Sequence, residues 1–297
     1  MRETLRAPAT QAERVEPRRE AARPRLVPPV RLVLAVSSLA LLLLLVLPLA
    51  AIFIRGVPEG ALARALDDPI VRQALTLSLV TTSVSMLLSL AIGTPVAFLL
   101  ARYRFRGHQL LDTLVDLPMV LPPAVAGVAL LMAFGRRGVA GPFLSDLGIE
   151  IPFTTIAVVL AQTFVAVPFY VRSARAGFES VDAGLEEVAA TLGAGSPTIF
   201  RTVTVPLALP ALLGGAVMAW ARALGEFGAT LMFAGNFAGR TQTMPLAIYQ
   251  TLASGRLDAA LALSIILVVV SFSVLLLFKV VVRRGAGAAA TEIVPRA

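Results

Sequence analysis

The sequence predicts an all-α integral membrane protein with six transmembrane helices and a two-helix loop on the cytoplasmic side. Two observations support this fold class. Of the 297 residues, 57% are hydrophobic and only 15% are charged, and the mean hydropathy is +0.84. Because soluble domains carry about 25% charged residues, this chain lacks the polar surface that would keep it in water. In addition, several stretches without charge are long enough to cross a bilayer.

A transmembrane helix needs about 20 apolar residues, since each residue adds about 1.5 Å of rise. The stretches that meet this length are residues 32–54, 73–101, 117–135, 151–171, 202–239 and 259–278. The fifth stretch differs from the others because it contains two charged residues, Arg222 and Glu226. Several stretches contain proline, for example Pro95, Pro118 and Pro168. Proline kinks helices, and the sequence leaves open whether these kinks serve packing or gating.

The distribution of basic residues orients the chain. With the N-terminus inside, the N-terminal tail contributes eight arginines, the 102–106 loop three, the 172–201 loop three and the C-terminal segment four basic residues. The loops on the opposite side contribute seven. This excess predicts a multi-pass protein of the cell (inner) membrane with both termini in the cytoplasm.

We predict four segments along the chain. Residues 1–30 form a disordered basic cytoplasmic tail, because they mix arginine, glutamate and proline without hydrophobic periodicity. Residues 31–54 form an additional N-terminal transmembrane helix, residues 70–282 a membrane core with a cytoplasmic loop at 180–207, and residues 283–297 a cytoplasmic tail. The N-terminal tail suits contact with lipid headgroups. Nucleic acid is not an expected partner, since no folded basic face or aromatic platform accompanies the tail.

The amino-acid composition argues against catalysis by this chain. There is no cysteine, which excludes disulfides and thiolate metal sites. The single histidine, His108, lies in a basic stretch and is interpreted as an exposed loop residue. A phosphate-binding loop needs a lysine followed by serine or threonine, but the only lysine is Lys279, at the end of the last apolar stretch. The sequence therefore predicts no enzyme, no catalytic residue, no metal site and no cofactor in this chain.

The loop at 180–207 predicts two short helices. Asp182 is a good N-cap and Gly193 supplies a left-handed C-terminal stop. Glu186 and Glu187 lie near the positive end of the helix dipole. One apolar face follows the i, i+3, i+4, i+7 spacing of a helix; it consists of Leu185, Val188, Ala189 and Leu192.

A second short helix is expected to begin with Ser196 as its N-cap and Pro197 at its first position. Pro206 and Pro210 are expected to mark its end and the start of the next span. Such a pair of helices suits insertion into a groove on another protein. It suits equally a position on the membrane surface or on the protein's own bundle, and composition does not decide between them.

The loop resembles the EAA signature of ABC importer permeases, in which a Glu-Ala-Ala run precedes a glycine and, later, Ile-x-Leu-Pro. Here the signature reads Glu187-Val188-Ala189, then Gly193, then Val203-Thr204-Val205-Pro206. The three valines are conservative departures. The resemblance implies a type I-like ABC importer permease fold and helices that dock on a separate ATPase. It implies a coupling role for Asp182, Glu186, Glu187, Ala189, Gly193 and Pro206.

Arg222 and Glu226 are spaced i, i+4 and can meet on one helix face. A lone charge at the bilayer centre costs about 2.5–3.5 kcal/mol on insertion scales, so pairing is favourable. Two interpretations stay open, an ion pair that holds helices together and a pair that lines the translocation path or its gate. In the second interpretation, the residues that line the translocation path or its gate are Arg222, Glu226, Phe227 and Thr230.

The A-R-A-L-G-E-F-G-A-T run from Ala221 and the G-R-T-Q-T-M-P-L-A-I-Y run from Gly239 resemble molybdate-type permeases, with sulfate and tungstate permeases close behind. The resemblance extends over about residues 70–282. It implies import of a tetrahedral oxyanion, most closely molybdate, by alternating access. It also implies a second copy of this chain, two ABC ATPase subunits that use ATP and Mg²⁺, and an extracytoplasmic oxyanion-binding protein.

The predicted outer loop offers hydrogen-bond donors that we expect to contact the binding protein or the arriving anion, although a plain solvated loop is the alternative. These residues are Asn236, Arg240, Thr241 and Gln242. Two other classes of protein remain as alternatives. One is an ion-coupled secondary transporter, which usually shows inverted repeats that are not visible here. The other is a membrane anchor or assembly factor without a transport role.

Overall fold

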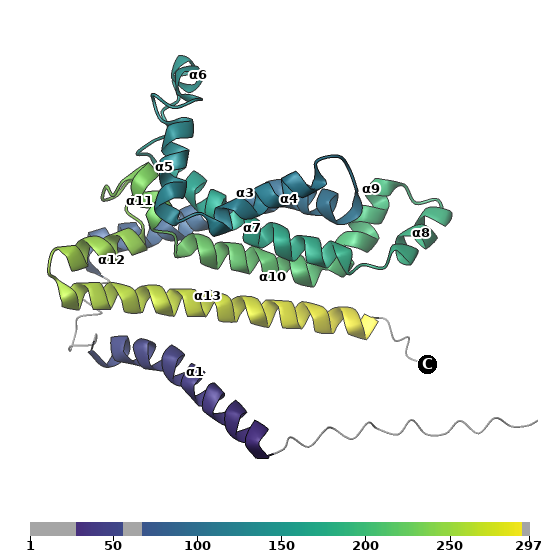
Figure 1. Ribbon diagram of the computed structural model, residues 1–297, viewed down its shortest axis with the longest axis horizontal. Helices are drawn as coiled ribbons and strands as arrows, with labels where there is room; N and C mark the ends of the chain where they lie inside the picture. The colour runs from purple at the N-terminus through teal and green to yellow at the C-terminus, as the bar shows by residue number, and fades with distance from the viewer. Residues whose placement is uncertain (1–27, 56–66, 293–297) are drawn as a thin grey trace, which may run out of the picture. The chain divides into compact units, whose positions relative to one another are not determined.

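The computed structural model describes residues 28–55 and 67–292 (Figure 1). Every regular element in these two ranges is a helix. Five helices are long and apolar enough to cross a bilayer, and a sixth crossing is present if one bent pair of helices is counted as a span. The predicted all-α membrane fold is therefore confirmed.

The chain divides into two units, residues Met1–Ala50 and Ala51–Ala297. The helix α1 (Pro28–Arg55) coincides with the predicted first span. Its apolar side chains are exposed along the helix, and none of the apolar window is buried. A helix that is apolar on all sides and exposed is suited to lipid contact. The predicted basic tail lies outside the described residues except for its last three positions.

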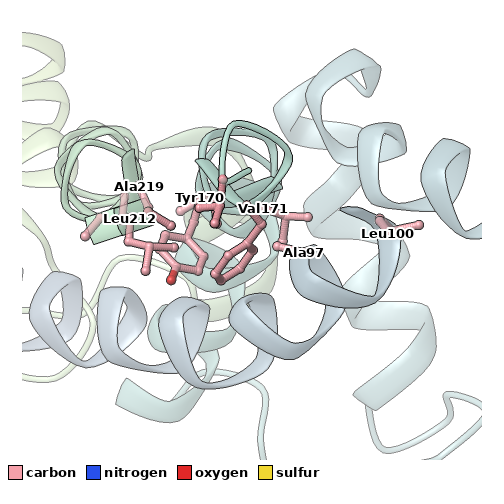
Figure 2. Close-up of a cluster of buried hydrophobic side chains, with 13 residues drawn as sticks. Ala97, Leu100, Tyr170, Val171, Leu212 and Ala219 are labelled. Carbon is pink, nitrogen blue, oxygen red and sulfur yellow. The ribbon is translucent and has the colours of Figure 1, made fainter. Parts of the chain in front are cut away.

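Three long helices form the centre of the second unit: α3 (Pro69–Arg102), α7 (Thr155–Glu179) and α10 (Val205–Leu224). They pack against one another through a buried cluster (Figure 2). The cluster is rich in alanine because small side chains let helix backbones approach closely in a membrane protein. The Tyr170 hydroxyl lies 2.6 Å from Thr94 Oγ1, and the Ser173 hydroxyl donates to the Ala211 carbonyl at 2.8 Å. These polar contacts tie α7 to α3 and to α10.

Gly215→Ala is expected to lower the free energy of unfolding by about 1–3 kcal/mol, the usual cost of overpacking. A Cβ atom at this position would lie 2.8 Å from Ser173 Cβ and 3.2 Å from the Tyr170 carbonyl oxygen, so α7 and α10 would have to separate. Gly214→Ala is the matched control, because its Cβ would meet nothing within 4 Å and alanine favours the helix. Thermal unfolding of the solubilised protein compares the two, and equal midpoints would contradict the expectation.

The predicted span at 117–135 is not one continuous helix. The chain forms two helices there, α4 (His108–Val120) and α5 (Pro123–Phe134), which meet at an angle of 118°. The backbone at Leu121 and Pro122 is extended, with ψ of 133° and 134°. Each of these residues precedes a proline, whose ring excludes the α conformation from the residue before it. The double proline therefore breaks the helix.

The prediction that His108 lies exposed in a loop is also wrong. His108 is the first residue of α4 and is buried. Its Nε2 atom lies 3.0 Å from the carbonyl oxygen of Leu100, and its ring packs beside Phe105. Gly107, with a φ of 92°, turns the chain sharply enough to bring the ring back against the end of α3. The histidine thus has a structural position at this turn.

The predicted fifth span at 202–239 is interrupted as well. The helix α10 ends at Leu224, and α11 (Gly228–Ala234) follows after a short break. Glycine is frequent here and favours helix ends. Three further helices complete this unit; they are α6 (Gly141–Asp146), α12 (Met244–Ala253) and α13 (Leu257–Glu292). Residues 283–292 of the predicted C-terminal tail continue α13 as helix, while residues 293–297 lie outside the described residues.

The connecting elements gather at the two ends of the long helices (Figure 1). At one end lie α8 (Ala183–Thr191), α9 (Ser196–Ile199) and the C-terminal end of α13. At the other end lie α11, α12 and the tip that carries α6. The loops that the sequence assigns to opposite sides of the membrane are therefore at opposite ends of the second unit.

Candidate functional site

The helix α8 forms as its sequence signals predict. The Asp182 side chain accepts a hydrogen bond from the Gly184 backbone N–H at 2.9 Å and caps the N-terminus. Gly193 has a φ of 87°, the left-handed conformation expected after the C-terminus. Both local predictions are confirmed.

The second short helix departs from its prediction in two ways. Its N-cap is Gly195, one residue before the predicted serine cap. The helix also does not end at Pro206 or Pro210, because a π-helical turn, η1 (Phe200–Thr204), joins it directly to α10. Pro206 lies in the first turn of α10, where a missing N–H is tolerated. Residues Ser196–Leu224 thus form one candidate span.

The apolar face of α8 is exposed. Leu185, Val188 and Leu192 are 50%, 60% and 83% exposed, and no residue of α8 is buried. Glu187 is exposed too, while Ala189 is half-buried. The possibility that this face packs on the protein's own bundle is therefore excluded. A contiguous apolar face at the end of a helix bundle is a feature of interaction sites.

Glu186 points the other way, toward the bundle. Its carboxylate pairs with Arg102 Nη2 at 2.9 Å and accepts a hydrogen bond from the Thr204 hydroxyl at 2.6 Å. The sequence predicted a coupling role for Glu186 together with its neighbour Glu187. The structure separates the two residues, because one is held within the protein and the other faces outward.

Arg222 and Glu226 form the predicted ion pair, with Nη1 and Oε2 2.8 Å apart. Glu226 lies beyond the end of α10, so the two residues do not share one helix face as predicted. The second carboxylate oxygen of Glu226 accepts a hydrogen bond from the Ala229 N–H at 2.8 Å, and the side chain is 1% exposed. Glu226 therefore neutralises an arginine and also caps α11.

Two other residues of the predicted path flank this pair. Phe227 is half-buried and packs against Tyr249, with ring centroids 5.2 Å apart. Thr230 is fully buried, and its hydroxyl has no hydrogen-bond partner within the described residues. The four predicted path residues thus lie around the break between α10 and α11.

The predicted outer loop separates into exposed and buried residues. Arg240 is exposed, while Thr241 and Gln242 are buried. The Thr241 hydroxyl accepts a hydrogen bond from the Phe237 N–H at 3.0 Å, which closes the loop on itself. Asn236 and Gln242 line a cavity of about 380 Å³ at this end of the bundle. Arg240 is therefore the residue of this set that is most accessible to an approaching partner.

Arg240 also borders a second cavity, of about 430 Å³, with Arg136 and Glu150. Arg136 pairs with Glu150 at 2.8 Å. The hydrogen bond and the charge of Glu150 raise the pKa of Arg136 above its ordinary value, so its guanidinium remains charged. Among the described residues, no group of three or more histidine, aspartate or glutamate side chains is arranged to hold a metal ion.

Residues 93–286 match the protein family described as "Binding-protein-dependent transport system inner membrane component". The chain belongs to this family of permeases. The match covers more than half of the chain, from the second half of α3 into α13, and it includes α8 and the break at Glu226. The resemblance to ABC importer permeases is therefore confirmed.

The permease is 47% identical over 239 residues to the molybdenum transport system permease protein ModB of Mycobacterium tuberculosis, covering 80% of this chain and 90% of that one. It is 36% identical over 259 residues to the sulfate transport system permease protein CysT of Salmonella typhimurium, covering 86% and 92%. Among solved structures it resembles a bacterial ABC transporter that imports alginate, with a TM-score of 0.71 at 17% identity over 86% of this chain and 95% of that one. The last likeness concerns the fold.

The permease also contains a charged network that the sequence interpretation missed. Arg175 Nη1 lies 2.7 Å and Arg172 Nη1 3.0 Å from the same carboxylate oxygen of Asp112. Arg172 also pairs with Asp116, and Arg175 with Glu179. The sequence signal for this network is the spacing of its charges. Asp112 and Asp116 are spaced i, i+4, and Arg172 and Arg175 are spaced i, i+3. They were overlooked because both sets lie just outside the predicted spans.

Proposed function

We propose that this permease forms the membrane path of an ABC importer for a tetrahedral oxyanion, and that the oxyanion is molybdate. The observation that supports molybdate as the substrate is the 47% identity to a molybdenum permease over 90% of that protein. Identity to a sulfate permease is lower, 36%, over a similar share of the chain. Sulfate is therefore the second candidate, and tungstate, which has the same charge and shape as molybdate, is the third.

The exposed face of α8 supports the proposed ATPase partner. An apolar strip of three side chains beside an exposed Glu187 supports docking into a groove of an ATPase subunit. The permease would act as a homodimer with two such ATPases, which bind ATP and Mg²⁺, and with an extracytoplasmic binding protein that delivers the oxyanion. Arg240 is exposed in the segment between α11 and α12, two helices that lie at the end opposite α8 (Figure 1), which supports contact with that protein or with the anion.

The same arrangement supports the predicted orientation. The end of the second unit that carries α8 and the last residues of α13 would face the cytoplasm, in keeping with the excess of arginine in the corresponding loops. For the N-terminus, the eight arginines of the N-terminal tail support a cytoplasmic position, so that both termini would be cytoplasmic in the cell membrane. ATP binding would draw the two ATPases together, move α8 with them and switch the paired bundles between inward-open and outward-open states.

The Arg222–Glu226 pair supports a role at the gate rather than a binding site for the anion. An arginine that is already neutralised attracts an oxyanion weakly. The pair lies where α10 ends and α11 begins, so a rearrangement there would reorient a short helix without unfolding a long one. Selectivity would then rest mainly on the binding protein, and the path needs only to be weakly polar.

The test is uptake by the permease reconstituted in liposomes with its ATPase and binding protein. We expect ATP-dependent uptake of radiolabelled molybdate, strong competition by unlabelled tungstate and weak competition by sulfate. Stronger uptake of sulfate than of molybdate would assign the permease to the sulfate class. Uptake that needs an ion gradient and proceeds without the ATPase would identify a secondary transporter.

A further inference from the structure

Glu186 holds the coupling segment to the membrane helices at a single carboxylate. Arg102, its ion-pair partner at 2.9 Å, is the last residue of α3. Thr204, its hydrogen-bond partner at 2.6 Å, is the last residue of the π-helical turn before α10. Arg102 also donates to the Val181 carbonyl at 3.2 Å, in the short link between α7 and α8. We call these four contacting residues the Glu186 junction.

The junction is shielded from solvent although it lies at the end of the bundle. The Arg102 and Glu186 side chains are 18% and 23% exposed, and Thr204 is 1% exposed. A shielded ion pair with an additional hydrogen bond holds its geometry more firmly than an exposed pair, and removal of one partner leaves the other charge uncompensated. The junction therefore fixes α8 relative to the ends of α3 and α10.

The backbone beside the junction is irregular. The η1 turn is π-helical, a rare conformation that is frequently found at functional sites. Helices kink at π-helical turns, so the segments on the two sides of η1 can change their relative direction. In this permease Thr204, at the boundary between η1 and α10, is the residue that Glu186 holds. Without that bond, displacement of α8 and α9 could be absorbed in η1.

We propose that Glu186 is the positioning residue that makes the coupling segment move as one body with α3 and α10. The inference rests on the proposed function, in which an ATPase displaces α8. In this arrangement Leu185, Val188, Leu192 and Glu187 bind the ATPase, while Glu186 transmits the movement to the membrane helices. Loss of the junction should therefore separate ATP hydrolysis from transport, with the ATPase still bound.

The experiment measures the molybdate transported per ATP hydrolysed by the complete complex in proteoliposomes, with radiolabelled molybdate as the probe. Glu186→Gln and Arg102→Met are each expected to lower this ratio about fivefold or more, the usual range of coupling between sites. The double variant should be no worse than either single variant, because both remove the same interaction. Co-purification of the ATPase should stay at the wild-type level in all three.

Arg104→Met is the matched control. Arg104 is exposed, lies two residues beyond Arg102 and has no ion pair in the described part of the chain. This variant should keep the wild-type ratio. Thr204→Val removes only the hydroxyl that donates the hydrogen bond to Glu186, and it preserves the shape of the side chain. It should lower the ratio to a smaller extent, and it decides the question if Glu186→Gln does not accumulate in membranes.

Two results would overturn the inference while the proposed function stands. One is wild-type transport with an unchanged ratio in Glu186→Gln or, where that variant does not accumulate, in Thr204→Val. The other is a loss of bound ATPase in proportion to the loss of transport, which would make Glu186 a docking residue. A wild-type complex that hydrolyses ATP but moves no molybdate, tungstate or sulfate would overturn the proposed function and this inference together.

Discussion

Glu226→Gln is expected to destabilise the permease by about 2.5–3.5 kcal/mol, the cost of an uncompensated arginine in a bilayer on insertion scales. The amide oxygen of the new glutamine side chain could still accept the hydrogen bond from the Ala229 N–H, so the change removes the charge and retains the cap. Arg222, which lies 2.8 Å from the carboxylate in the native protein, would be left without its partner. Transport should be lost, because the break between α10 and α11 is organised around this carboxylate. Unfolding of the protein in bicelles and uptake by liposomes measure the two effects.

The double variant Arg222→Met with Glu226→Gln tests whether the charge pair is responsible. When both charges are removed, the stability should return close to that of the native protein, since no uncompensated charge remains and the glutamine amide can still accept the hydrogen bond from the Ala229 N–H. If the single and the double variants are equally unstable, Glu226 acts only through packing or capping. That result would contradict the ion-pair explanation.

Val188→Asp is expected to weaken binding of the ATPase by about 100-fold or more, the effect of losing an interface hot spot. Val188 is 60% exposed on the apolar face of α8, so the folded permease tolerates the aspartate, but an ATPase groove would have to bury an unpaired charge. Binding of the purified ATPase to the permease in nanodiscs is the measurement. Transport should fall in parallel with binding.

Val139→Asp provides the control for that experiment. Val139 is 94% exposed and lies in the turn before α6, and α6 lies at the end of the bundle opposite α8 (Figure 1). The same substitution at this position should leave ATPase binding unchanged. Equal binding by Val188→Asp and the native permease would show that the ATPase does not use the apolar face of α8.

The features that depend on neighbours in the sequence could be predicted from the sequence. The long apolar stretches identified α1, α3, α7 and α13, and the local signals at Asp182 and Gly193 identified α8. The EAA-like run then placed the chain in its family. In each case an apolar length or a cap is a local property that tertiary packing does not override.

The features that depend on contacts between distant residues could not be predicted. Nothing near Glu186 in the sequence indicates that it pairs with Arg102 while Glu187 faces outward. The broken third span is different, because its cause was visible. Each residue before a proline avoids the helix, so Pro122 and Pro123 should have outweighed the apolar length of residues 117–135.

The exposed strip on α8 has a consequence for how the cell handles this subunit. The apolar side chains of Leu185, Val188 and Leu192 stay exposed whenever the permease is made without its ATPase. Surfaces of that kind attract chaperones, proteases and other copies of the same chain. Copies that remain unassembled should therefore be cleared by quality control, which would keep the two kinds of subunit in balance without a dedicated regulator.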